Sequence, residues 1–213
     1  ILFPIWVMVV AAFKPGNKVL VDPLVPSNFT LDTMRDSWTD GKLGRALLNS
    51  AIVAIVVTLF QVVTSILAAY AFVFLKFPGK GIAFAVFLST LLIPFEATVV
   101  VNRQTVEDLG WLNTYQGLAV PFLATAFGTF LIRQVFLTLP KEMREAARMD
   151  GLGHWGFLRE VAVPLVRPSV GALALFGFLS TWNQYLWPAL TITDDDWNTV
   201  QSSLRVLAAA NID

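Results

Sequence analysis

The stretch ALLNSAIVAIVVTLFQVVTSILAAYAFVFL, residues 46–75, decides the fold of this chain. It contains no charged residue and is longer than the roughly 20 residues that a helix needs to cross the hydrocarbon core of a membrane. Backbone amides and carbonyls in lipid have no water to bond, so a helix is expected here rather than an open strand. The run therefore predicts a membrane-spanning helix, long enough to tilt or to project beyond the bilayer.

Other apolar runs repeat this character along the chain. They cover residues 81–101, which are apolar apart from Glu96, and residues 110–132 and 168–193, which are uncharged. Residues 1–13 lack a basic leader and a small-residue cleavage site, and they look like the second half of a span. We therefore predict an all-α integral membrane protein, a single domain over residues 1–213 built as a bundle of transmembrane helices. Six spans are expected in the full protein, with the terminal ones truncated here.

The composition supports a membrane protein and excludes several other classes. Of the 213 residues 56% are hydrophobic and 14% charged, against roughly 45–50% and 25% in a soluble domain. A formal net charge of zero argues against binding nucleic acid by bulk charge. The chain has no cysteine and one histidine, His154, which excludes thiolate and histidine metal clusters. We expect the lipid bilayer as a partner, and no nucleic acid, no metal and no cofactor bound in this chain.

Lysine and arginine set the expected orientation, because cytoplasmic loops carry an excess of them. Lys76 and Lys80 flank one turn, and segment 133–167 carries six more basic residues, so both are predicted inside. Segment 102–110 and the acidic residues after the last run are predicted outside. The alternation of spans also places segment 14–45 outside, with a short surface helix over residues 31–38. The basic residues of that segment fit the rule poorly: Lys14, Lys18, Arg35, Lys42 and Arg45.

The inside segment 133–167 is too charged to span and indicates two short helices joined by a turn. Pro140 suits a first helical turn, and Glu142 and Glu145 follow where the helix dipole favours negative charge. Asp150 and Gly151 are expected to end this helix, since glycine tolerates the left-handed conformation of a helix stop. A second amphipathic stretch runs over residues 154–161 and leads to Pro164.

Small and charged residues on the first of these helices suggest a docking surface. Ala146 and Ala147 allow close approach to another protein, and Glu142, Glu145 and Arg148 could fix the register by charged contacts. From the residues alone, an ordinary solvated cytoplasmic loop is the alternative. His154 is interpreted as a surface contact residue.

Polar residues inside the spans have two interpretations each. Glu96, after Pro94, either borders a path across the membrane or marks an interfacial helix end. Asn183 and Gln184 are candidates for the same path, because buried amides need partners. Tyr185 is a path candidate or an interfacial anchor. Small residues at helical spacing, Ser65 with Ala69 and Ala124 with Gly128, predict close helix packing.

The spacing of the inside segment resembles a known motif. Glu145-Ala146-Ala147 is followed after three residues by Gly151, and after nine more by Val-Ala-Val-Pro at 161–164. This string resembles the EAA loop of ABC importer permeases, although that family prefers isoleucine and leucine at positions 161 and 163. The resemblance implies a cytoplasmic coupling loop at about residues 138–167 whose helix docks in a groove of an ATP-binding subunit. The implied coupling residues are Glu142, Glu145, Ala146, Ala147, Asp150, Gly151 and Pro164.

The same resemblance implies a set of partners. These are a second homologous permease subunit, two ATP-binding subunits that hold ATP and Mg, and an extracytoplasmic substrate-binding protein. The location implied is the bacterial cytoplasmic membrane. The translocation path would be bounded by Asn183, Gln184, Tyr185 and Glu96.

Further strings narrow the resemblance. Residues 47–50, 69–72 and 77–80 are similar to carbohydrate-type importers, on the side of the maltose system's smaller permease. Residues 130–140 and 182–188 look like the second permease of glycerol-3-phosphate or glycerophosphodiester importers. The implied solute is therefore a glycerophosphate compound, with a sugar of the maltose or trehalose type as the alternative.

Two other classes of function make different demands on the sequence. The chain has no Walker-type glycine-rich Gly-Lys-Ser/Thr string, so an ATP site in this chain is not expected. An intramembrane enzyme would need paired carboxylates, a serine–histidine pair or metal ligands within the spans, and Glu96 alone cannot supply them. A passive channel predicts transport without an ATPase partner. We therefore expect a transport subunit with no catalytic residue.

Overall fold

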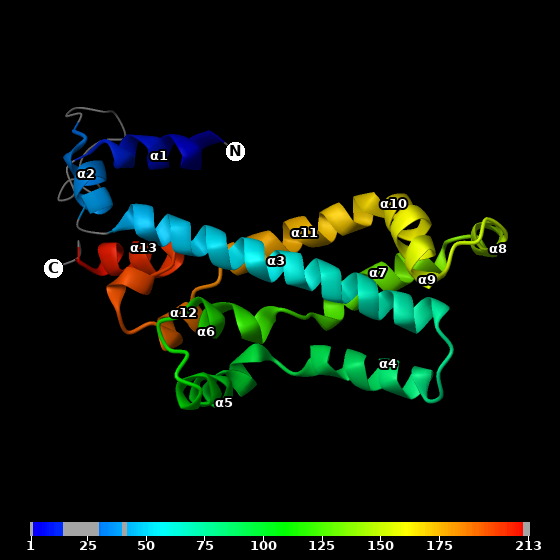
Figure 1. The fold of residues 1–213 in the computed structure, drawn as a ribbon. Coiled ribbons are helices and arrows are strands. Elements are labelled where there is room, and N and C mark those ends of the chain that lie inside the picture. The colour runs from blue at the N-terminus through cyan, green and yellow to red at the C-terminus, as the bar shows by residue number, and fades with distance from the viewer. Residues whose placement is uncertain (1, 15–29, 40–41, 211–213) are drawn as a thin grey trace.

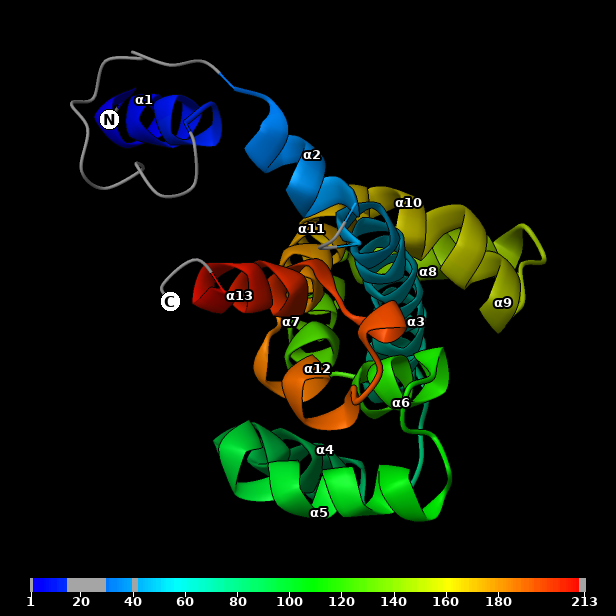
Figure 2. The same cartoon turned by 90° about the vertical axis from the view of Figure 1, so that its left-hand side faces the viewer.

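The computed structural model describes residues 2–14, 30–39 and 42–210, and within these ranges it contains helices and no β-strand. One long helix, α3 (Leu43–Phe74), runs most of the length of the molecule, with α8 (Lys141–Met149) beyond one end and α13 (Val200–Ala210) beside the other (Figure 1). Helices α1 (Leu2–Ala12) and α2 (Asp32–Thr39) lie to one side of the bundle in both views (Figures 1 and 2). The all-α prediction is confirmed, and α2 confirms the short helix expected over residues 31–38.

Helix α3 matches the uncharged run that predicted it. It is 32 residues long and is the one described helix long and apolar enough to cross a membrane alone. Its end is marked by Leu75, which is extended at φ −88° and ψ 151°. The Lys80 ammonium donates to the carbonyls of Val73 at 3.1 Å and Leu75 at 3.0 Å, which lack helical partners at this end.

The run predicted as one helix over residues 81–101 is broken. Helix α4 (Lys80–Ser89) continues into η2 (Thr90–Leu92), and α5 (Phe95–Asp108) then leaves at 95°. Pro94 explains the correction, because it has no amide hydrogen to continue the ladder and disfavours a helical conformation at the residue before it. Ile93 is accordingly extended, at φ −87° and ψ 111°.

The run over residues 110–132 also bends. Helix α6 (Tyr115–Ala119) and η3 (Val120–Phe122) meet α7 (Ala126–Leu137) at 43°. Carbonyls left free at the bend are contacted from α3: Gln61 Nε2 donates to the Phe122 carbonyl at 2.9 Å. Thr64 Oγ1 lies 3.2 Å from the Leu123 carbonyl and shares its hydrogen with the Phe60 carbonyl at 2.8 Å. Side chains of a neighbouring helix therefore satisfy backbone groups that water could not reach in lipid.

The last predicted run, residues 168–193, forms two helices. Helix α11 (Arg167–Trp182) ends at Asn183, and α12 (Leu186–Thr191) starts after Tyr185. The η5 turn (Asp195–Trp197) then leads to α13. Counting each bent pair as one span gives up to four spans within the described residues, α3 included.

Helices α7 and α11 both pack on α3 and also contact each other, and the three form the centre of the bundle (Figure 2). A Cβ at Gly128 of α7 would lie 2.4 Å from Ser65 Oγ of α3, so these helices approach as closely as the small residues predicted. One buried cluster joins α3 and α7 to the loop that carries α8, through residues such as Ala69, Phe136 and Phe157.

Candidate functional site

Helix α8 protrudes from one end of the bundle (Figure 1). Pro140 precedes it with extended backbone, Glu142 lies in its first turn and Arg148 in its last, as the helix dipole favours. Glu142, Glu145, Ala146 and Arg148 are exposed, whereas Ala147 is only 4% exposed. The helix therefore has one face on the protein and one face free to meet another.

Gly151 ends α8 in the left-handed conformation, at φ +81°. Its amide donates to the Arg148 carbonyl at 3.0 Å, and the Leu152 amide donates to the Ala147 carbonyl at 2.9 Å. These two bonds form a Schellman motif, with Asp150 as the C-cap residue. The helix stop expected at Asp150 and Gly151 is thus confirmed.

The second half of the loop is helical but irregular. It comprises α9 (His154–Gly156), the π-helical η4 (Phe157–Ala162) and α10 (Val163–Leu165), and it meets α11 at 79°. Pro164 cannot donate an amide hydrogen to the carbonyl four residues earlier, which disfavours a continuous α-helix here. Widened π turns are frequent at functional sites.

A groove of about 360 Å³ lies between α8 and this second run. Four residues predicted for coupling line it: Ala146, Ala147, Asp150 and Pro164. The structure places Glu142 and Glu145 on α8 outside the groove lining, and Gly151 forms the turn that holds the two runs together. The seven predicted residues thus occupy one compact unit.

Aromatic packing connects this unit to the transmembrane helices. Phe157 is 4% exposed, and its ring centroid lies 5.2 Å from that of Phe74 in an edge-on contact. The Phe74 ring lies 5.6 Å from that of Phe136 on α7. Displacing η4 would therefore press directly on α3 and α7, because closely packed interiors transmit strain.

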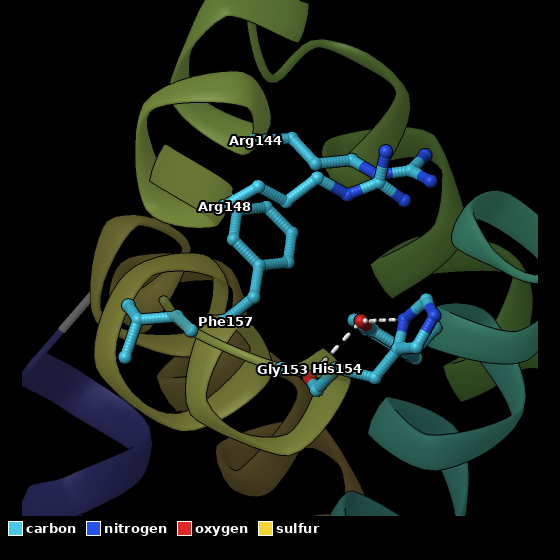
Figure 3. A pocket seen from close by; sticks show the side chains of 7 residues that line it. Arg144, Arg148, Gly153, His154 and Phe157 are labelled. Carbon is cyan, nitrogen blue, oxygen red and sulfur yellow. Dashed lines mark hydrogen bonds between the residues drawn. The ribbon is translucent and has the colours of Figure 1, made fainter. Parts of the chain in front are cut away.

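A polar contact reinforces the connection beside a small pocket (Figure 3). The Tyr70 hydroxyl of α3 lies 3.0 Å from the His154 carbonyl oxygen, to which it donates, and 2.9 Å from His154 Nδ1. Arg144 and Arg148 project side by side from α8 over Phe157, facing His154 across the pocket (Figure 3). Neither arginine forms an ion pair with another residue in the described part of the chain.

The predicted path residues lie elsewhere, near the other end of the bundle. Glu96 is exposed in the first turn of α5. Asn183 is exposed, and its Oδ1 accepts from Gln201 Nε2 at 3.3 Å. Gln184 is half-buried, and the Tyr185 ring lies 4.6 Å from the Arg205 guanidinium carbon.

These four residues form no single site in the described part of the chain. Asn183 and Tyr185 face α13, whereas no hydrogen bond or ion pair connects Glu96 to any of the other three. The start of α5 does lie near α12, because Phe95 packs on the fully buried Trp187 with centroids 6.1 Å apart.

The end opposite α8 is closed by polar contacts between distant segments. Asp196 accepts from Lys42 Nζ at 2.6 Å and lies 3.2 Å from Arg45 Nη1. Asn49 Nδ2 donates to the carbonyls of Asp196 and Asn198, and its Oδ1 accepts from Tyr115. Lys42 and Arg45, which fit the expected excess of basic residues on the cytoplasmic side poorly, are therefore paired with the Asp196 carboxylate.

Sequence reasoning missed Tyr70, Gln61 and Thr64 as residues that join elements. Gln61 and Thr64 carried a usable signal, since Gln and Thr side chains within a membrane span hydrogen-bond across helices. Tyr70 carried no such signal, because its partner, the His154 carbonyl, is 84 residues away in the chain.

Comparisons with known proteins agree with this geometry. The family described as "Binding-protein-dependent transport system inner membrane component" matches residues 49–206. The chain is similar to the sn-glycerol-3-phosphate transport system permease protein UgpE of Escherichia coli strain K12, at 36% identity over 98% of this chain and 77% of that protein. It is also similar to the UgpE protein of Pectobacterium atrosepticum, at 35% identity over 99% and 78%.

A solved structure shows the same fold. A chain in the crystal structure of a bacterial ABC transporter involved in the import of the acidic polysaccharide alginate superposes with a TM-score of 0.85. The match covers 96% of this chain and 73% of that chain, at 21% identity. With the family match and the two relatives, this establishes that the chain belongs to the inner membrane components of binding-protein-dependent transport systems.

Proposed function

We propose that this chain forms half of the translocation path of an ABC importer and couples ATP hydrolysis by its partners to uptake of glycerol-3-phosphate or glycerophosphodiesters. One observation carries the coupling role: α8 protrudes on a Schellman stop while its loop is packed through Phe157 onto α3 and α7. A lever of this kind needs both a free face and a rigid connection.

The free face of α8 suits a protein partner. Glu142, Glu145 and Arg148 are exposed on α8 and offer charges of both signs beside a groove lined by Ala146 and Ala147. Complementary charges fix register and speed association more than they add affinity. Two ATP-binding subunits, one beneath each permease subunit, would close on ATP and move the two loops on the cytoplasmic side.

The solute assignment rests on the relatives, both named as sn-glycerol-3-phosphate transport permeases. A second permease subunit would complete the path, and an extracytoplasmic binding protein would deliver the solute to the outer face. Glu96, Asn183, Gln184 and Tyr185 are proposed to border the path near that face.

The test is ATP hydrolysis by the reconstituted complex with its binding protein. Glycerol-3-phosphate and a glycerophosphodiester are expected to stimulate hydrolysis, whereas maltose and trehalose are not. Stimulation by a sugar alone would contradict the solute and favour a sugar importer. Solute flux without an ATP-binding subunit would contradict the coupling role and indicate a passive channel.

A further inference from the structure

A cavity of about 370 Å³ lies between α3, α7 and α11, halfway along the span of α3. Gln61 of α3, Thr125 at the start of α7 and Ser180 of α11 line it. The aromatic rings of Phe127 and Phe176 lie at its side, and both residues are about half-exposed, at 49% and 59%. The volume falls within the roughly 300–1,000 Å³ of small-molecule sites.

Three side-chain oxygens that line this cavity have no hydrogen-bond partner among the described residues. Gln61 donates its amide to the Phe122 carbonyl, but its Oε1 accepts nothing from the described residues. The Thr125 hydroxyl makes no cap bond, and that of Ser180 bonds no described residue either. Behind them, Thr58 Oγ1 is buried with no hydrogen-bond partner. A buried hydroxyl without a partner is costly in a low-dielectric interior, so that of Thr58 needs an explanation. Ser180 is exposed and Gln61 and Thr125 are half-buried, so their oxygens are open to a ligand in the cavity.

Gly177 keeps the polar side of the cavity open. A Cβ at this position would lie 2.8 Å from Gln61 Oε1 and 3.7 Å from Thr58 Oγ1. Any larger residue on α11 would therefore press against the oxygen that the cavity leaves free, and Gln61 has little room to turn because its amide is held by Phe122.

The chemistry of the lining selects the ligand. The residues lining the cavity carry no charge, so a phosphate group would find no cation there. An amide oxygen and two hydroxyls instead match donors and acceptors of an alcohol, and phenylalanine rings match its CH groups. We propose that this cavity binds the uncharged, hydroxyl-bearing part of the imported solute as it crosses the membrane. The proposal rests on the proposed function and adds a site to it.

The absence of cysteine from the 213 residues makes the cavity testable by single substitutions. Ser180→Cys and Thr125→Cys are introduced into the complete complex in proteoliposomes and exposed to a membrane-impermeant thiol reagent. Leu175→Cys is the matched control, because Leu175 is 58% exposed on the same helix but does not line the cavity. Both cavity cysteines are expected to react, and the control is not.

Solute protection distinguishes a binding site from a water-filled gap. Glycerol-3-phosphate delivered by the binding protein at about ten times its half-saturating level should slow labelling of both cavity cysteines about ten-fold. Labelling that the solute leaves unchanged would overturn the proposal, as would no labelling at either position.

A functional variant provides the second measurement. Ser180→Ala should raise the solute concentration for half-maximal uptake about three- to ten-fold, the range expected for one lost hydrogen bond. Thr181→Val, on the next residue of α11, should leave uptake unchanged. Unchanged uptake by Ser180→Ala together with absent protection would refute the site.

Failure of this site is distinguishable from failure of the proposed function. If the unsubstituted complex hydrolyses ATP in response to solute and the cavity cysteines are not protected, only the site is wrong. If no solute stimulates the unsubstituted complex, the proposed function is wrong, whatever the labelling shows.

Discussion

At the scale of single residues, Tyr70 connects the membrane bundle to the loop that carries α8. Tyr70→Phe removes the hydroxyl that donates to the His154 carbonyl at 3.0 Å while keeping the ring in the buried cluster. The cost should be about 1 kcal/mol of stability, as for a typical hydrogen bond. We expect less solute transported per ATP hydrolysed, measured by parallel uptake and hydrolysis in proteoliposomes.

His154→Ala is the matched control for Tyr70. It removes the ring but keeps the backbone carbonyl that accepts from the Tyr70 hydroxyl, so its effect on the transport ratio should be the smaller one. A ratio lowered more by His154→Ala than by Tyr70→Phe would contradict the role assigned to the carbonyl contact.

Asp196 and Lys42 form a second residue-scale contact, at the end opposite α8. The hydrogen bond from Lys42 and the nearby charge of Arg45 lower the pKa of Asp196 below its ordinary 3.8. The hydrogen bond to Asp196 raises the pKa of Lys42 above 10.5. A lowered acid pKa stabilises the fold above the unfolded value, and a raised amine pKa does so below it.

The pair should therefore stabilise the protein between these limits. Its contribution is lost as pH falls through the lowered pKa of Asp196 and as it rises through the raised pKa of Lys42. Asp196→Asn should lower the melting temperature in detergent at about pH 7, and this deficit should shrink as the pH falls below 3.8. Asp195→Asn, whose amide oxygen can still accept from Asn198, is the control. A deficit of Asp196→Asn that does not shrink as the pH falls would refute this reasoning.

At the scale of elements, Gly151 sets the angle between α8 and the rest of its loop. Its φ of +81° disfavours any residue with a Cβ, although a Cβ there would meet no atom within 4 Å. The effect of a substitution at Gly151 should therefore come from backbone strain rather than from steric crowding. Gly151→Val should uncouple ATP hydrolysis from uptake and leave assembly with the partner subunits intact, measured by co-purification and by paired hydrolysis and uptake assays.

Two controls separate strain from loss of a glycine. Gly151→Asn should retain much of the coupling, because asparagine tolerates the left-handed region better than other residues with a side chain. Gly153→Ala should be neutral, since Gly153 has φ −73° and open space around it. Normal uptake by Gly151→Val would remove the role proposed for this turn.

At the scale of the whole molecule, the two ends of the bundle differ in charge. The turn between α3 and α4, which carries Lys76, and the α8 loop with its basic residues lie at one end (Figure 1). The η5 turn, which includes Asp195 and Asp196, leads into α13 at the other end. We expect the α8 end to face the cytoplasm. In the cysteine-free chain, Lys76→Cys should react with an impermeant reagent only in inside-out vesicles, and Asp195→Cys only in right-side-out ones. Labelling of both from one side would contradict this orientation.

The sequence by itself determined the features that depend on local chemistry. An uncharged run of sufficient length must be a helix in lipid, and α3 is one. Proline and glycine marked the ends of α8, because proline suits the start of a helix and glycine tolerates the left-handed conformation of a helix stop. The motif spacing around Glu145 and Gly151 indicated the family that the comparisons then established.

Only the tertiary structure decided how the other spans bend and what the bends leave open. Pro94 and Pro121 were visible in the sequence, but a proline breaks a membrane helix only where other groups satisfy the freed carbonyls. At residues 122 and 123 those groups are Gln61 and Thr64, about 60 positions away in the chain. The cavity beside Gln61 likewise exists because Gly177 of α11 meets α3, and pairing between distant helices follows from packing rather than from local sequence.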